Sequence, residues 1–304
     1  MTQTPIRSAK SLRLRNRELA RPRPDVSVII TALNAEAYLR EALESIFTQR
    51  TSAACEILLV DDGSTDGTVA LATSLVHNSP HTLDILQHPG RKNRGISASR
   101  NLALEHARAP VTAFLDADDV WLPDRLAHQL PYLRSHPSVA MVYAQAERWL
   151  DFSLPFSPTI GSLGENFTPA LLPAGQTGGF ISSPGLLAWF LADESMTPCT
   201  CTVLVRTEIA RQLGGFVHSF TGIYDDQVFY SKLALAHPIF VSEEVVARYR
   251  QHAGSCCAAA RRAHIGDHGR KLFLSWLKQY RKAFPQSPSL PQELTAELEA
   301  AFVS

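Results

Sequence analysis

The chain has 304 residues, of which 45% are apolar and 19% are charged, so its composition is that of a folded protein rather than a disordered one. The formal net charge is zero, which argues against a protein that binds nucleic acid. This zero hides an imbalance, because residues 1–24 carry seven Lys or Arg against Glu18 alone, a local charge of +6 that leaves −6 for the rest. We therefore expect residues 1–24 to form a basic flexible arm.

Targeting and redox signals favour a cytoplasmic protein. The arm lacks the apolar core of a signal peptide, and apolar stretches such as residues 185–192 are far shorter than the ~20 residues that span a bilayer. The five cysteines are odd in number and lack the spacing of paired zinc-binding knuckles. We expect free thiols in a reducing compartment, and no secretion or membrane span.

From residue 25 onward, apolar runs of strand length alternate with amphipathic segments of helix length. The pattern predicts strands at 26–31, 56–61, 83–86 and 111–115, and helices at 36–49, 66–76, 96–107 and 123–133, the last opened by Pro123. Strand runs without alternation indicate burial on both faces. The rhythm predicts an α/β fold with a mostly parallel, doubly wound, Rossmann-like sheet.

The pattern changes after about residue 143. Residues 151–195 are rich in Pro, Gly and Ser, which favours either an insertion that faces the substrate or a partly mobile lid. Regular structure returns with strands predicted at 200–205 and 245–249 and helices at 207–213 and 226–236. A basic helix is predicted at 261–284, with an apolar stripe of Leu272, Phe273, Trp276, Tyr280 and Phe284.

Polar side chains collect where the predicted strands end. These residues are Thr31 and Asn34, then Asp61 and Asp62, then Asp116, Asp118 and Asp119. Ligands of open parallel sheets bind beyond the carboxyl ends of the strands, so we expect a cleft with an acidic floor. Neither a GxGxxG nor a GxxxxGK[ST] motif is present, which removes the main support for dinucleotide-binding and P-loop folds.

An acidic floor needs a cation to join it, and Mg²⁺ or Mn²⁺ bridging to a ligand's phosphates is the expected one. The alternative is structural, because Asp116 to Asp119 precede a helix whose N-terminus favours acidic residues. Asp66 is interpreted as such a cap, which leaves Asp61 and Asp62 to face the cleft.

Four motifs in order carry a family resemblance. They are residues 27–34 (SVIITALN), 59–66 (LVDDGSTD), 93–101 (NRGISASRN) and 114–119 (FLDADD). Further matches follow at 214–216 (GGF), 224–227 (YDDQ) and 248–255 (RYRQHAGS). Each motif is weak alone, but in this order they resemble a family 2 glycosyltransferase with the GT-A fold. The first four cover roughly residues 25–135, and the whole set covers about 230 residues.

The resemblance implies a role for each matching residue. Asp118, the last acid of a DxD motif, would bind the metal, and His252 would lie near the diphosphate and that metal. Thr31, Asp62 and Arg94 would contact the nucleotide, with Arg100 competing with Arg94 for base or phosphate. Asp226 would be the catalytic base, with Asp116 and Asp225 in acceptor-binding or supporting roles. The usual Glu-Asp pair of the family is Asp225-Asp226 here, which puts the acceptor contact of the first acid in doubt.

The resemblance also implies an activity and a domain plan. The expected activity is inverting, metal-assisted sugar transfer from a nucleotide-diphosphate sugar, by family habit UDP-linked, to a glycan or lipid-linked acceptor hydroxyl. The catalytic GT-A domain would span residues 25–255, with a nucleotide-sugar half (25–145) and an acceptor half (146–255). Residues 256–304 would form a C-terminal helical extension.

Several alternatives stay open at the level of sequence. A nucleotidyltransferase would use a similar pocket, although residues 31–34 lack its Gly- and Lys/Arg-rich triphosphate loop, and an inactive nucleotide-sugar-binding protein would keep the fold. Asp226 could be a helix N-cap beside Gly222, and His252 an ordinary hydrogen-bonded histidine. His264 and His268 are interpreted as solvated surface residues.

The basic arm and the basic C-terminal helix leave a further choice. Basic residues beside Phe273, Trp276 and Tyr280 are typical of peripheral contact with an anionic membrane surface. The competing hypothesis is that the helix packs its apolar stripe on the catalytic domain. Burial of the stripe decides between the two, because a covered stripe cannot also enter lipid.

Overall fold

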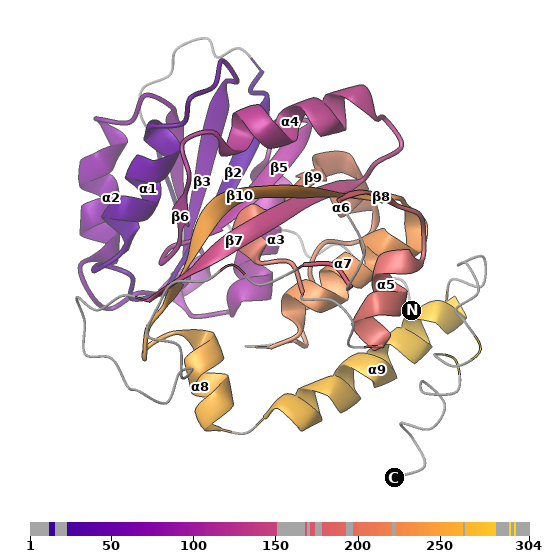
Figure 1. Cartoon of the computed structure of the whole chain (residues 1–304). Coiled ribbons are helices and arrows are strands. Elements are labelled where there is room, and N and C mark those ends of the chain that lie inside the picture. The colour runs from indigo at the N-terminus through magenta and orange to yellow at the C-terminus, as the bar shows by residue number, and fades with distance from the viewer. Residues whose placement is uncertain are drawn as a thin grey trace.

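The protein folds around one mixed β-sheet. The computed structural model describes residues 12–15, 23–150, 168, 171–173, 178–192, 197–220, 223–263, 265–283, 292 and 295. Ten strands form the sheet in the order β1-β4-β3-β2-β5-β9-β7-β10-β6, with β8 paired to β10 (Figure 1). Helices pack on both faces, so the predicted α/β, doubly wound architecture is confirmed.

The first half of the chain is the regular part. Its parallel strands are β2 (Val26–Ala32), β3 (Cys55–Asp61), β4 (Thr82–Gln87) and β5 (Val111–Asp116). Its helices are α1 (Leu39–Phe47), α2 (Thr68–Val76), α3 (Ile96–His106) and α4 (Arg125–Ser135), with a 3₁₀ turn at Pro89–Arg91. All eight predicted elements are present within three residues of their expected bounds. Pro123 lies in the turn before α4, which begins two residues later than predicted.

The continuous apolar runs reflect two separate cores. In β2, Val28 and Ile30 face the core formed with α1, α2 and α4, while Ile29 faces the core formed with α3 and α7. Because successive side chains of a strand point to opposite faces, a strand covered on both sides must be apolar at every position.

The second half of the sheet is mixed. It contains β6 (Val120–Trp121), β7 (Met141–Leu150), β8 (Gly179–Ile181), β9 (Leu204–Arg206) and β10 (Ile239–Gln251). The helices are α5 (Gly185–Leu191), α6 (Thr207–Gln212) and α7 (Asp225–Ala236), and Thr200–Thr202 form a 3₁₀ turn. Strands β7 and β10 pair in parallel and cross the front of the molecule together (Figure 1).

Two predictions for this half were wrong in extent. The regular pattern does not end at residue 143, since β7 continues to Leu150, and β10 begins six residues before the predicted strand. After Ala144 most residues of β7 are half-buried, and only Ala146 and Leu150 are buried, so the strand lacks a continuous apolar signal. The strand predicted at 200–205 is instead a turn followed by β9. The Thr202 hydroxyl donates to the carbonyl of Cys199 (2.8 Å) and supports that turn. Most of the expected insertion or lid at 151–195 lies outside the described residues.

The predicted C-terminal helix is two helices, α8 (Cys256–Arg262) and α9 (Gly266–Ala283). The second helix begins at Gly266, a poor helix former to which an apolar pattern is insensitive. The buried face of α9 consists of Phe273, Leu274 and Leu277, and Trp276 and Tyr280 pack against the same core. Leu272 was wrongly placed in this stripe, since it is 47% exposed, and Phe284 lies outside the described residues.

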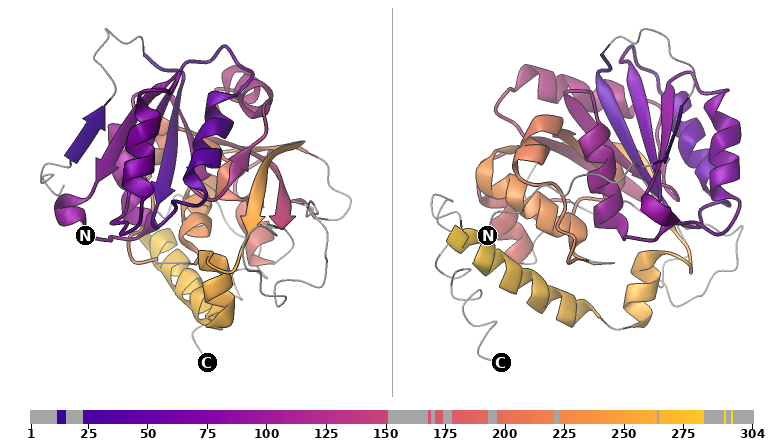
Figure 2. Two further views of the ribbon diagram at one scale, coloured as in Figure 1. Left: turned by 90° about the vertical axis from the view of Figure 1, so that its left-hand side faces the viewer. Right: turned by 180° about the vertical axis from the view of Figure 1, so that it is seen from behind.

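Of the predicted basic arm, the structure describes residues 12–15 and 23–24. Leu12–Arg15 form β1, which pairs antiparallel with β4 at one edge of the sheet (Figure 2).

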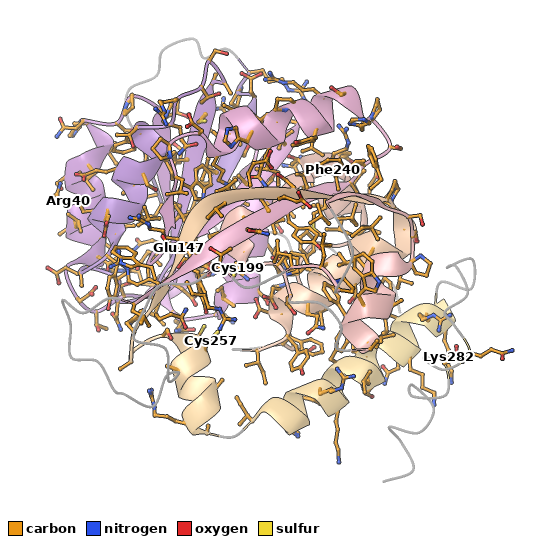
Figure 3. The ribbon with its side chains drawn as sticks, in the orientation of Figure 1. Arg40, Glu147, Cys199, Phe240, Cys257 and Lys282 are labelled. Atoms are coloured by element: carbon orange, nitrogen blue, oxygen red, sulfur yellow. The ribbon has the colours of Figure 1, made fainter. Side chains whose placement is uncertain are left out.

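All five cysteines are free thiols, as expected, with Cys55 and Cys201 buried and Cys256 exposed. Cys257 lies at the start of α8 (Figure 3). No helix within the described residues has the length and hydropathy needed to cross a membrane.

Candidate active site

The carboxyl ends of β2, β3 and β5 meet at one edge of the sheet. Thr31 is in register with Asp116, and Ala32 is in register with Asp61. The Thr31 hydroxyl donates to Oδ1 of Asp116 (3.3 Å). The structure therefore brings these predicted site residues together, as the parallel topology requires.

Arg100, on α3, joins two acidic segments that are far apart in the chain. Its Nη2 donates to Oδ1 and Oδ2 of Asp116 (2.9 and 3.2 Å), and its Nη1 donates to Oδ2 of Asp225 (2.6 Å). The guanidinium is buried, with 3% of the side chain exposed. Burial alone would lower the pKa of Arg100, but the two carboxylates raise it above its ordinary value, so it stays charged.

This bridge changes the interpretation of Arg100. The sequence left Arg100 as a rival to Arg94 for the nucleotide, yet its guanidinium is committed to Asp116 and Asp225. Burial raises the pKa of Asp116 even though Arg100 opposes the shift. Asp116 and Asp225 thus both bind the Arg100 guanidinium, which is a contact that a supporting role would involve.

Asp118 lies next to His252, the other candidate metal ligand. His252 Nε2 is 3.0 Å from Asp118 Oδ2, and the imidazole packs on the ring of Tyr38. The Asp118 side chain is 28% exposed and that of His252 is 11% exposed. The carboxylate oxygen of Asp118 and the ring nitrogen of His252, 134 positions apart in the chain, therefore lie side by side at a partly exposed place.

Arg250 fixes the loop that carries Asp118. Its backbone N–H donates to Oδ1 of Asp119 (2.9 Å), and its Nε donates to the carbonyl of Asp118 (2.7 Å). Burial, together with Asp118 and Asp116, raises the pKa of Asp119 well above its ordinary value. Strand β10 thus positions both His252 and its partner, while the buried Asp119 is a structural member of the acidic cluster.

Asp118 and His252 fit a hard divalent metal whose remaining ligands are not protein side chains. No group of three or more His, Cys, Asp and Glu side chains among the described residues is arranged to hold a metal ion. Mg²⁺ and Mn²⁺ are commonly bound through one or two carboxylates, with waters and substrate phosphates completing the shell. Asp118 with His252 supplies a protein share of that size, and the exposed part of the Asp118 carboxylate leaves room for a ligand.

Asp62 fastens the loop between β4 and α3. Its Oδ1 accepts the backbone N–H of Arg94 (2.7 Å) and its Oδ2 accepts that of Gly95 (2.9 Å). Gly63, at φ 89°, allows this approach, because a Cβ there would lie 2.8 Å from the carbonyl oxygen of Arg91. The Arg94 side chain is exposed, whereas Asp62 is 4% exposed. Contacts of Thr31, Asp62 and Arg94 with a nucleotide stay predictions.

His88 lies in the same loop and was not predicted as a site residue from the sequence. His88 Nε2 is 2.9 Å from the hydroxyl of Ser99 and 3.6 Å from Oδ1 of Asp62. Burial lowers the pKa of His88, so the ring is neutral at pH 7. The available signal was a histidine two residues after the end of the strand predicted at 83–86, near the position where the other strands carry site residues.

Asp225 and Asp226 form the first turn of α7. The N-cap of this helix is Tyr224, and its side chain makes no capping hydrogen bond. The alternative in which Asp226 is the N-cap is therefore wrong, because Asp226 is the second helical residue. Gly222, the other half of that alternative, lies outside the described residues.

The environment of Asp226 is that of a carboxyl group poised near neutral pH. Burial and the adjacent Asp225 carboxylate raise the pKa of Asp226 to about 7, while Arg100 opposes the shift. A carboxylate with a pKa near the working pH is a better proton acceptor than an ordinary exposed one. The site thus combines a candidate base with a candidate metal position.

Comparison with known proteins shows which family and which folds the chain resembles. Residues 27–170 match the model of the family described as Glycosyl transferase family 2. EpsE of Bacillus subtilis (strain 168), itself named only provisionally as a glycosyltransferase, is 29% identical over 194 residues, which are 64% of this chain and 60% of EpsE. The chain thus spans less than two thirds of the length of that curated relative.

Two solved structures share the fold. TarS of S. aureus (residues 1–349), in complex with UDP-GlcNAc, superposes with a TM-score of 0.59 at 20% identity, covering 78% of this chain and 61% of that one. The mannosyltransferase PcManGT from Pyrobaculum calidifontis, in complex with GDP-Man and Mn²⁺, gives 0.60 at 21% identity and covers 92% and 69%. At these identities, the likeness establishes the fold.

The electrostatic coupling of the acid pair is testable on the protein alone. Asp225→Asn removes the charge that repels ionised Asp226 and frees Arg100 to act on Asp226, so both effects lower the pKa of Asp226. We expect the pKa to fall from about 7 by on the order of one unit, measured by carboxyl ¹³C NMR titration. Asp124→Asn, at a partly exposed position on another loop, is the control. An unchanged or higher pKa in Asp225→Asn would contradict the assigned cause.

Proposed function

We propose that this chain, which matches glycosyl transferase family 2 over residues 27–170 and has the GT-A fold, transfers a sugar from a nucleotide-diphosphate sugar to an acceptor hydroxyl with inversion at the anomeric carbon. The donor would bind the half formed by residues 25–145, and the acceptor would bind the half formed by residues 146–255. Residues 256–304 would extend this catalytic domain.

The observation that carries the proposal is the Arg100 bridge. Asp116 is two residues from the candidate metal ligand Asp118, and Asp225 is next to the candidate base Asp226. One guanidinium binds both Asp116 and Asp225, which supports a single site that contains the candidate metal position and the candidate base. Inverting transfer needs these two functions side by side, a base for the attacking hydroxyl and a positive charge for the leaving diphosphate. A hydrolase would instead need two carboxylates flanking the scissile bond.

On the acceptor side, Asp226 would take the proton of the hydroxyl as its oxygen attacks the anomeric carbon. The bond from that carbon to the diphosphate oxygen breaks at the same time, and the diphosphate leaves on the opposite face. The raised pKa of Asp226 suits this role, because a carboxylate of higher pKa is a stronger base than an ordinary aspartate and is still substantially ionised near pH 7. Asp225 would keep Asp226 in place through Arg100.

On the donor side, Asp118 and His252 would hold Mn²⁺ or Mg²⁺. When bound, the metal neutralises the charge that develops on the departing diphosphate. Thr31, Asp62 and Arg94 would contact the nucleotide, with the exposed Arg94 guanidinium offering a charge to base or phosphate. We propose uracil as the base, and comparing UDP-sugars with GDP-sugars as donors tests this choice. The acceptor would be a glycan or a lipid-linked sugar.

The first prediction concerns the metal. Turnover should require Mn²⁺ or Mg²⁺ and stop with excess EDTA. Asp118→Asn should weaken Mn²⁺-dependent UDP binding about 10-fold or more by calorimetry, because a metal-bridged diphosphate loses one of its few protein anchors. Binding of UMP, which lacks the diphosphate, should change less, and Asp124→Asn should resemble wild type. Full activity in EDTA, or equal losses for UMP and UDP, would refute the metal assignment.

A second prediction separates chemistry from binding. Asp226→Asn keeps the shape of the side chain and removes the base, so kcat should fall on the order of 10²-fold or more while donor affinity stays near wild type. In wild type, kcat/KM should rise with pH through about 7, because only ionised Asp226 accepts a proton. Loss of donor binding in Asp226→Asn would make it a binding residue and leave Asp225 as the candidate base. Donor binding without any turnover by wild type would favour an inactive binding protein.

We propose a cytoplasmic location with contact at an anionic membrane surface. Such contact would depend on the attraction between basic side chains and anionic lipids, without insertion of apolar side chains. The apolar stripe of α9 is covered by the domain, with Phe273 and Leu277 fully buried. Lys271 and Lys282 are exposed, and Lys282 points away from the domain (Figure 3). Well-placed basic residues contribute about 1 kcal/mol each at such a surface.

The membrane proposal predicts salt-dependent sedimentation. Wild type should pellet with vesicles containing phosphatidylserine at low salt and be released at high salt. The double variant Lys271→Glu/Lys282→Glu should pellet several-fold less, since each substitution reverses a charge. Equal recovery with neutral and anionic vesicles would contradict the proposal without affecting the assigned activity.

A further inference from the structure

The residue that introduces the acid pair has an unusual backbone. Tyr224 lies at φ 63° and ψ 2°, in the left-handed region that side chains other than glycine rarely occupy. Its carbonyl accepts the N–H of Val228 (2.9 Å), so Tyr224 sets the direction in which α7 starts. Asp225 and Asp226 are the next two residues. A tyrosine persists in this conformation only where its surroundings hold it there.

Helix α9, nearly 50 residues further along the chain, contributes to those surroundings. Phe273 is fully buried, and its ring stacks on that of Tyr224 with centroids 5.6 Å apart and planes at 21°. One turn earlier, Gly269 lies against the same ring. A Cβ at Gly269 would lie 2.8 and 2.9 Å from the Cδ2 and Cε2 atoms of Tyr224, and 2.2 Å from Cδ1 of Ile223. Positions 269 and 273 share one face of the helix.

Glycine is a poor residue for the interior of an α-helix, because it loses more backbone freedom on folding than alanine does. Its place in the first two turns of the 18-residue α9 is explained by the close approach of the Tyr224 ring. The helix is itself well anchored. Leu274 and Leu277 are buried. Arg270 Nη2 donates to the carbonyl of Leu191 (2.8 Å), the last residue of α5, which lies beside α9 (Figure 1).

We propose that Gly269 and Phe273 are positioning residues of the active site, which hold Tyr224 in its left-handed conformation and thereby fix the first turn of α7. In an ordinary backbone conformation of Tyr224, α7 would start in another direction. Asp225 would then leave Arg100, and the Asp226 carboxylate would turn away from its present environment. This inference rests on the proposed role of Asp226. It gives the C-terminal extension a part in catalysis that the family motifs do not contain.

The test compares substitutions on two faces of α9 in the full-length protein. Gly269→Ala and Phe273→Ala should lower kcat about 10-fold or more, because small misplacements of a reacting group carry large rate penalties. The donor KM and the Mn²⁺-dependent affinity for UDP should stay within about two-fold, since the nucleotide half is not touched. Leu272→Ala, also an apolar truncation in α9 but at a 47% exposed position, should leave kcat unchanged.

A double-mutant cycle tests whether α9 affects kcat through Tyr224. Glycine adopts φ 63° without strain and has no ring. In Tyr224→Gly, α9 therefore has neither a strained backbone to hold nor a ring to contact. Phe273→Ala should therefore lower kcat clearly in the wild-type background and about two-fold or less in the Tyr224→Gly background. Equal losses in both backgrounds would overturn the proposal, as would a lower Tm with unchanged kcat in folded Phe273→Ala.

A readout without turnover separates this proposal from the assigned activity. With its pKa raised to about 7, Asp226 binds a proton more tightly in the folded state, so stability falls as pH rises from about 4 to 7. The Tm of Asp226→Asn relative to its parent should therefore increase across that window. In the Gly269→Ala background this increase should shrink, because a displaced Asp226 is less buried. An undiminished increase would overturn the positioning role, even if no nucleotide sugar were turned over.

Discussion

The charge balance of the site depends on one buried guanidinium. Arg100 is the cation that Asp116 and Asp225 share, and each acid belongs to a different half of the proposed domain. Removing one member of such a buried group typically destabilises a protein by about 3–5 kcal/mol, since a charge is left without compensation. Arg100 therefore sets the distance between the two halves and the potential at Asp226. The neighbouring loops are arranged around it, with Arg250 holding Asp118 and Asp119 and the N–H groups of Arg94 and Gly95 held by Asp62.

The parallel half of the fold was predictable because its signals are local. A strand covered on both faces must be apolar at every position, as β2 is, and parallel strands necessarily bring their carboxyl ends together. The meeting of Thr31, Asp62 and Asp116 at one edge follows from that topology. The nearness of Asp118 and His252 was implied by family resemblance alone, since no local pattern links a loop after β5 to the end of β10.

The remaining features depend on contacts that a single sequence does not encode locally. Arg100 looked like a ligand for phosphate because its partner Asp225 lies 125 residues away. Leu272 looked like part of the α9 stripe because periodicity gives spacing but not the direction of the core. The ends of β7 and β10 were missed because half-buried polar positions interrupt their apolar runs. Asp226 was open to interpretation as a cap because a tyrosine in the sequence gives no sign that its backbone is left-handed.

The two short strands at the ends of the sheet have a consequence for colloidal behaviour. In the described part of the chain, the strand order ends with β1, four residues long, on one side and with β6, two residues long, on the other. A long unpaired strand offers its backbone N–H and C=O groups to other molecules and seeds aggregation, and short edge strands offer few. Because β1 covers β4 residues Asp84 to Gln87, a chain shortened by its first two dozen residues would expose a new edge of buried side chains. Such a shortened protein would self-associate by sheet extension even though all the candidate site residues were present.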